Sequence, residues 1–238
     1  MSAAPDYSQF PRLSELLAAA RKLAKDPSKV WGWKTPTDNP RKQQILRGHE
    51  DELSELNEAA WRYFLATKAP KFANTERLRG WQQATDALNE VAAYVYLKRR
   101  FDAHPRFVTE SKTETPDLEL ETANGLVLCE SKTVNESQQE LEARSKSQAS
   151  RTAPALDAHY FRRVNAAVDK AKSQLSAYRG EERPLRVVWL TLHFDDWVGD
   201  YASTYLRQID EHLKASPAGE PDLELRYRTA WPTRESAA

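Results

Sequence analysis

Hydrophobic and polar positions along this chain follow two periods, and the change from one to the other predicts the order of its elements. Apolar residues recur every three or four positions in the first part, which predicts helices at 11–25, 50–68 and 74–101, with a long connection at 28–47. Alternation then favours strands at 106–112, 117–122 and 126–132. The same patterns predict a helix at 157–178, a buried strand at 185–194, a helix at 201–214 and a strand at 222–228.

This order of elements predicts the fold class. A helix, three strands and then alternating helices and strands indicate an α/β protein with a mixed central β-sheet flanked by helices. Residues 1–73 form an N-terminal helical extension in this interpretation, and residues 74–238 form the core. The segment 133–156 is rich in Ser, Gln, Glu and Arg, and we expect it to be a mobile loop.

Composition narrows the chemistry that the chain can perform. The single cysteine, Cys129, excludes an internal disulfide and a multi-thiolate metal site. The five histidines are scattered, and the seven glycines form no phosphate-binding loop. A metal in this protein would therefore bind mainly to oxygen atoms, which favours Mg²⁺, with Mn²⁺ as the alternative. Apolar runs are too short to span a bilayer and the N-terminus lacks an apolar signal core, so we expect a cytoplasmic protein without membrane contact.

Charge is balanced overall but is unevenly distributed along the chain. Lysine plus arginine and aspartate plus glutamate each number 35, which gives no general indication of nucleic-acid binding. Segment 111–140 carries a net charge of −5, whereas segment 141–190 carries +5. An acidic cluster beside a basic strip would suit a metal site next to a polyanion, and an ordinary solvated surface would look the same.

The stretch 115–133 predicts a β-hairpin that gathers charged side chains. With Asn124-Gly125 as the two-residue loop, Asp117 would face Lys132 and Glu119 would face Glu130. All four side chains then lie on one face, because side chains alternate with a period of two. Opposed carboxylates repel each other, and a divalent cation would remove that conflict. A solvent-facing hairpin with a cross-strand Asp–Lys pair is the alternative.

The same hairpin carries a family resemblance. Pro116-Asp117, twelve further residues and Glu130-Ser131-Lys132 resemble the PD-(D/E)xK signature of the restriction-endonuclease-like nuclease superfamily. The resemblance runs from about Trp81 to Phe194 as a pattern of elements. Two partial copies lack the other half of the signature: Glu110-Ser111-Lys112 has no preceding Pro-Asp, and Pro221-Asp222 has no following Glu-x-Lys.

Two flanking helices add candidate residues. Glu90 lies in an apolar stripe of the 74–101 helix, where an unpaired carboxylate would be costly. Members of the superfamily often place an acidic residue at this position, near the metal; a carboxylate tip that reaches solvent, or a salt bridge to a neighbouring arginine, is the alternative. Lys170 and Gln174 lie four residues apart on the polar side of the 157–178 helix, from which the family often contributes a Gln or a Lys to the site.

The resemblance implies a restriction-endonuclease-like core and a role for each residue. Asp117 and Glu130 would bind the metal with the backbone carbonyl of Ser131, and Glu90 would bind it directly or through water. Lys132 would position or deprotonate the attacking water, and Gln174 would assist. The implied activity is Mg²⁺-dependent hydrolysis of phosphodiester bonds, in DNA rather than RNA and by internal rather than terminal cleavage, by a protein that could act as a homodimer.

Three other functions remain open at this stage. The chain could be a catalytically silent nuclease-like module that binds nucleic acid or a protein partner. It could be a toxin-neutralising or other interaction protein that uses the 133–156 loop. A hydrolase built on His193 with Asp195 or Asp196 is the third, although no nucleophile stands out beside them.

Overall fold

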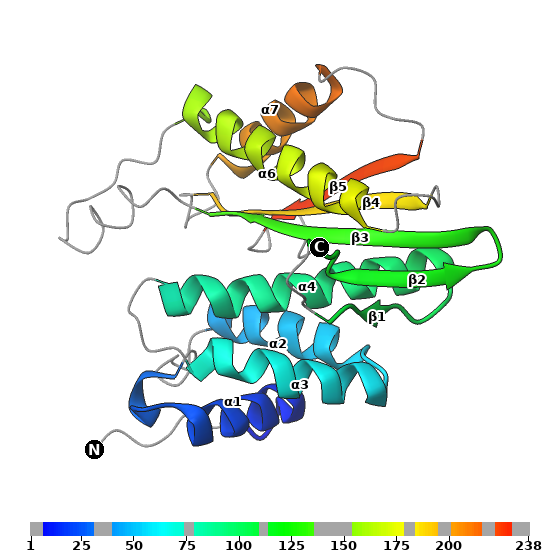
Figure 1. Ribbon diagram of the computed structural model, residues 1–238. Helices are drawn as coiled ribbons and strands as arrows, with labels where there is room; N and C mark the ends of the chain where they lie inside the picture. Colours follow the sequence, from blue (N-terminus) through cyan, green and yellow to red (C-terminus); the bar gives the residue numbers. More distant parts are fainter. Residues whose placement is uncertain are drawn as a thin grey trace. The chain divides into compact units, whose positions relative to one another are not determined.

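The computed structural model places two compact units, Met1–Val108 and Thr109–Ala238 (Figure 1). It describes residues 7–30, 40–73, 79–109, 114–135, 154–178, 184–194, 201–215 and 222–229. The helix that begins at Arg79 belongs to the first unit. The division expected between residues 73 and 74 concerns the proposed nuclease core and stays a prediction.

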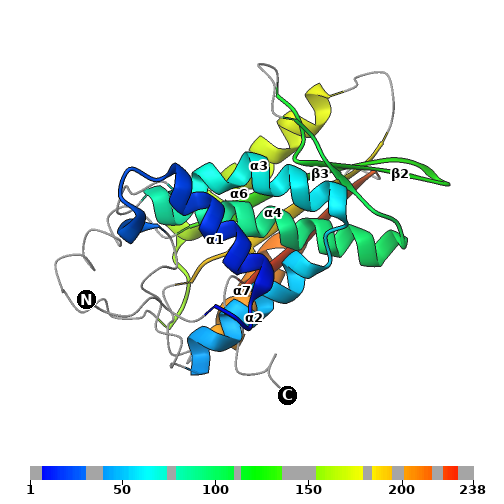
Figure 2. The same ribbon diagram turned by 90° about the horizontal axis from the view of Figure 1, so that it is seen from below.

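The first unit is a stack of helices. Its elements are α1 (Pro11–Leu23), the 3-10 turn η1 (Pro27–Lys29), α2 (Pro40–Ser54), α3 (Glu58–Ala73), α4 (Arg79–Phe101) and the short strand β1 (Arg106–Phe107). Helices α2 and α3 each pack against both α1 and α4. They lie between these two in Figure 1, and in the turned view they lie on either side of α1 (Figure 2). In the part of the chain that the structure describes, no helix has the length and apolar character needed to cross a bilayer.

Helix boundaries in this unit differ from the expected ones. The helix predicted at 50–68 is two helices, because the side chain of Asn57 accepts a hydrogen bond from the Ala60 N–H at 2.8 Å and starts α3 there. Residues 40–47, expected in a connection, form the first half of α2. The strand predicted at 106–112 is limited to two residues among those described, and positions 110–112 lie outside them.

A buried carboxylate fixes the start of α1. Both oxygens of Glu50, on α2, accept backbone N–H groups, one from Arg12 and one from Leu13, each at 2.9 Å. The first N–H groups of a helix have no partner inside it, and Pro11 at the first position has none to offer. Glu50 thus caps α1 from a neighbouring helix and is itself 7% exposed.

The second unit carries the sheet. Its elements are β2 (Leu118–Thr122), β3 (Gly125–Val134), α6 (Ala158–Ala177), β4 (Leu185–Leu192), α7 (Ala202–Ala215) and β5 (Leu223–Thr229). The strands lie in the order β2-β3-β4-β5, with β2 antiparallel to β3 and the other pairs parallel. Helices α6 and α7 cover one face of this sheet (Figure 1). The predicted class, α/β with a mixed sheet and flanking helices, is confirmed.

The core of this unit lies between the sheet and the two helices. Leu128 of β3 and Leu190 of β4 are fully buried against Val164 and Leu175 of α6 and Ile209 of α7. Side chains alternate along a strand, so Glu130 and Lys132 lie on the same face of β3 as Leu128. The two polar residues of the signature are therefore presented on the α6 side of the sheet.

The register of the hairpin differs from the expected one. Thr122 pairs with Gly125 and Glu119 pairs with Leu128, so the loop is Ala123-Asn124. The expected loop requires a positive φ at Asn124, yet Asp102 is the one non-glycine with a positive φ in the described chain. Gly125 adopts φ +113° as the first residue of β3.

The predicted cross-strand pairs are therefore wrong. Glu119 faces Leu128 rather than Glu130, and the neighbour of Asp117 is Glu130 rather than Lys132. The pairing is shifted by two residues from the expected one. Side chains alternate with a period of two, so an even shift keeps Glu119 on the same face as Glu130 and Lys132.

Candidate metal and catalytic site

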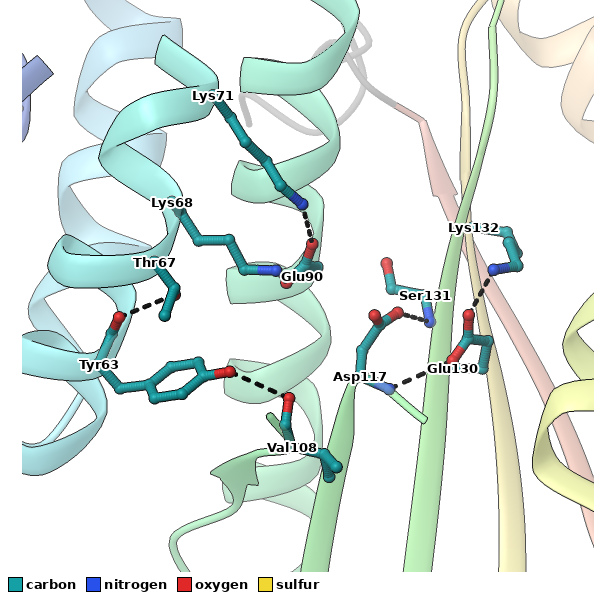
Figure 3. A network of polar contacts seen from close by, with 10 residues as sticks. All are labelled: Tyr63, Thr67, Lys68, Lys71, Glu90, Val108, Asp117, Glu130, Ser131 and Lys132. Carbon is teal, nitrogen blue, oxygen red and sulfur yellow. Dashed lines mark hydrogen bonds and ion pairs between the residues drawn. The ribbon is translucent and has the colours of Figure 1, made fainter. Parts of the chain in front are cut away.

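Asp117 and Glu130 are joined by the backbone at the start of the hairpin. The Asp117 N–H donates to Glu130 Oε2 at 3.2 Å, and the Ser131 N–H donates to Asp117 Oδ2 at 2.8 Å (Figure 3). Glu130 thus accepts the N–H of Asp117, and Asp117 accepts the N–H of the residue that follows Glu130. The two acids of the signature are held beside each other although thirteen positions separate them in the sequence.

Lys132 completes the group. Its ammonium donates to Glu130 Oε1, the oxygen that the backbone of Asp117 does not use (Figure 3). The Glu130 side chain is 2% exposed, whereas the Lys132 side chain is 19% exposed. A nearly buried carboxylate is costly without a cation, and Lys132 supplies one while its chain reaches toward solvent.

Three carboxylates act on the thiol of Cys129, the residue of β3 that precedes Glu130. This thiol is fully buried, and burial raises its pKa well above the ordinary value. The carboxylates of Asp117, Glu130 and Glu224 raise this pKa further, because a thiolate near them would be repelled. Three carboxylates therefore lie near one point of the sheet, and Lys132 and Arg226 pair with two of them.

The donor set fits a hard divalent cation with few protein ligands. Asp117 and Glu130 supply carboxylate oxygens, each with a second lone pair beyond its hydrogen bond, and Ser131 supplies a backbone carbonyl. The described residues contain no group of three or more His, Cys, Asp or Glu side chains placed to hold a metal. Mg²⁺ is commonly held by one or two carboxylates and keeps several waters, so two acids suffice.

Glu90 has its partners within the helical unit. Its Oε2 lies 2.6 Å from the Lys68 ammonium and its Oε1 lies 3.6 Å from that of Lys71, both on α3 (Figure 3). The alternative of a salt bridge is thus observed, with two lysines in place of an arginine. The role of Glu90 as a metal ligand stays a prediction.

Gln174 extends from α6. Its side-chain Oε1 is buried and has no hydrogen-bond partner among the described residues. Its residue as a whole is half-buried. Lys170, one turn earlier, is exposed, as expected for the polar side of the helix.

Sequence reasoning missed a contact between α6 and the hairpin. The Tyr178 hydroxyl donates to Glu119 Oε2 at 3.1 Å, and Glu119 is only 2% exposed. Hydrophobic periodicity places Tyr178 in the apolar stripe of the predicted 157–178 helix, and such a pattern does not indicate a partner for its hydroxyl. The alternation of β2 did place Glu119 on the face of Glu130, which was the available signal.

His193 directly follows β4, and its backbone makes two hydrogen bonds. His193 donates its backbone N–H to the Val134 carbonyl at 3.0 Å, and its own carbonyl accepts the Tyr160 hydroxyl at 3.2 Å. Asp195, Asp196 and most of the expected mobile loop, residues 136–153, lie outside the described residues. Residues 133 and 134 of that expected loop belong to β3.

Comparison with known proteins found no matching family model, no matching curated protein and no matching solved structure. The functional interpretation of these residues therefore rests on their chemistry and placement.

Proposed function

We propose that this protein is a metal-dependent nuclease that hydrolyses phosphodiester bonds of nucleic acid, with its catalytic centre at Asp117, Glu130 and Lys132. The observation that carries the proposal is the pair of backbone hydrogen bonds that hold the two carboxylates together beside Lys132. The sequence of a helix, the hairpin, α6 and β4 supports a restriction-endonuclease-like core. DNA is the proposed substrate and internal cleavage the proposed mode.

Each residue of the centre has a defined task. Asp117, Glu130 and the Ser131 carbonyl would hold Mg²⁺ or Mn²⁺, with Glu90 as the proposed further acid. When bound, this ion supplies a polarised phosphate and a more acidic water. The backbone N–H groups of Asp117 and Ser131 orient the two carboxylates before substrate arrives.

Lys132 acts from the other side of Glu130. Its ammonium is a mobile donor on a flexible chain, and it is partly exposed. From there it can hold the attacking water in line or stabilise negative charge that develops on the phosphoryl oxygens. Gln174, whose amide oxygen is buried without a partner in the described chain, is the proposed helper from α6.

The test is a cleavage assay on single- and double-stranded DNA and RNA with Mg²⁺, Mn²⁺ or EDTA. The assay compares the unaltered chain with Asp117→Asn and Lys132→Ala. We expect metal-dependent cleavage that falls at least about 100-fold in each variant, because each removes a group that acts on the reacting phosphate or its water. Linear and circular substrates separate internal from terminal cleavage.

The chain offers a matched control for the aspartate. Asp222 is the aspartate of the second Pro-Asp pair, forms an ion pair with Arg186 and lies outside the hairpin. Asp222→Asn makes the same chemical change and should leave cleavage near the unaltered rate. Absence of cleavage on every substrate, by a folded protein whose melting temperature Mg²⁺ does not raise, would refute the nuclease and favour the catalytically silent module.

A further inference from the structure

The helix α6 has two flanks that can be told apart by their contacts. On one flank the Phe161 ring lies 4.5 Å from that of His212, and Asn165 Oδ1 lies 2.8 Å from His212 Nε2, so this flank faces α7. On the other, Arg163 donates to the carbonyl of Asn135, which follows β3, and Tyr178 donates to Glu119 of β2. This second flank faces the hairpin.

Helical periodicity assigns the two lysines of α6 to opposite flanks. Lys170 lies seven positions after Arg163, so it falls on the hairpin flank. Lys172 lies seven positions after Asn165, so it falls on the α7 flank. The described residues provide neither lysine with an ion-pair partner. The same side-chain type is thus presented on both sides of one helix.

The contacts at the two ends of the hairpin flank also show which residues of α6 lie beside which residues of β3. From Arg163 to Tyr178 the helix rises roughly 22 Å. From Asn135 back to Leu128, the partner of Glu119, the strand spans roughly 23 Å, nearly the same length. Interpolation between these ends places Lys170 level with Lys132, and Gln174 level with Glu130.

We propose that the hairpin flank of α6, through Arg163 and Lys170, binds phosphates of the nucleic-acid backbone next to the scissile bond. The inference rests on the proposed nuclease function and adds the path of the substrate. Asp169, the acid within α6, lies on the side of the helix away from the sheet and is exposed. The hairpin flank of α6 is therefore uniformly basic or neutral beside an acidic centre, as a polyanion held by its flanking phosphates requires.

The two cations are matched to a phosphate chain. Arg163 and Lys170 are separated by roughly 10 Å along the helix axis. Phosphates of one duplex strand advance about 3.4 Å each along the duplex axis and wind around it, so the two cations can contact different phosphates of the same strand. Arg163 is held in place by the Asn135 carbonyl at 2.6 Å and by stacking over the Tyr160 ring at 5.1 Å, which limits the entropy lost on binding.

The test measures binding without cleavage. Anisotropy of labelled DNA and RNA oligonucleotides, single- and double-stranded, is recorded in EDTA across a salt series for the unaltered chain, Lys170→Gln and Lys172→Gln. We expect Lys170→Gln to weaken binding about 3- to 10-fold and to lower the slope of log K against log salt by about 0.7 to 0.9. Lys172→Gln, which removes the same charge from the same helix, should change neither.

The outcomes separate this inference from the function it rests on. Equal effects of the two lysine variants would overturn it, since only net charge would then matter. It would also fail if Lys170→Gln bound like the unaltered chain while Mg²⁺-dependent cleavage was still lost in Asp117→Asn; the nuclease would then stand. Binding that depends on Lys170 without any cleavage would support phosphate binding by the hairpin flank and refute the nuclease function. No binding to any oligonucleotide would overturn both.

Discussion

Removing the carboxylate of Glu90 should strongly destabilise the helical unit. Glu90 on α4 and Lys68 on α3 form an ion pair at 2.6 Å whose side chains are only 9% and 6% exposed. Glu90→Ala would remove the carboxylate that faces the buried Lys68 ammonium. Breaking a buried pair by deleting one member costs about 3 to 5 kcal/mol, because the remaining charge has lost both water and its counter-ion.

This cost can be measured as a shift in chemical unfolding. Urea denaturation followed by circular dichroism, in EDTA, should show a midpoint about 2 M lower for Glu90→Ala, given a slope of about 2 kcal/mol per molar urea. Glu58→Ala is the matched control. Glu58 pairs with Arg62 on the surface of α3, with both side chains more than half exposed, and its loss should cost about 0.5 kcal/mol or less.

A second variant separates the charge from the packing. Glu90→Leu combined with Lys68→Met replaces the pair with apolar side chains and should recover most of the lost stability. A midpoint for Glu90→Ala within about 0.5 M of the unaltered chain would refute the structural role of the pair. If Glu90→Ala instead lost only the stabilisation that Mg²⁺ provides, Glu90 would be acting as the metal ligand that the resemblance implies.

Three further predictions concern single side chains. The side chains of Lys98 and Arg99 donate to Glu55 and lower its pKa, so the pair stabilises the fold above the unfolded-state pKa of about 4.3 and loses this effect as the pH falls through the lower folded pKa. Glu55→Gln should therefore melt below the unaltered chain at neutral pH, and the difference should vanish near pH 2. The Cys129 thiol, whose pKa is raised by burial, should react with a thiol reagent only in denaturant; rapid labelling of native protein would contradict this. Glu50→Gln keeps one acceptor for the start of α1 and should cost about 1 to 2 kcal/mol in urea unfolding, and an unchanged midpoint would argue against the cap.

The hairpin shows which parts of a site can be predicted from local sequence. Alternation along residues 117–132 predicted Asp117, Glu119, Glu130 and Lys132 on one face. The structure agrees for the last three, whereas Asp117 precedes β2, and its side chain lies on the other side of β3 from Glu130 and Lys132 (Figure 3). The loop was placed one position too late, because Asn-Gly is a strong turn signal. The Thr122 hydroxyl accepts the Asn124 N–H at 3.2 Å and donates to the Gly125 carbonyl at 2.8 Å, and a propensity for turns does not include this bridge.

Contacts between elements could not be predicted in the same way. Hydrophobic spacing continues through Leu53, Leu56 and Ala60, so it gave no sign of the break between α2 and α3, and the cap by Asn57 decided it. The pairing of Glu90 with Lys68 depends on how α3 lies along α4, which no local pattern specifies. The contact from Tyr178 to Glu119 likewise needs the placement of α6 on the sheet.

The backbone bonds of Asp117 and Glu130 make loop length a determinant of the site. Five cross-strand pairs, from Thr122–Gly125 to Leu118–Cys129, separate the loop from the two acids, and each pair transmits the register to the next. One residue inserted at Ala123-Asn124 would displace the Asp117 N–H from Glu130 and turn alternate side chains to the other face. Substitutions along the strands would leave this spacing intact. The length of the two-residue loop thus sets the distance between the carboxylates. A change in this length should abolish cation binding without altering any residue of the centre.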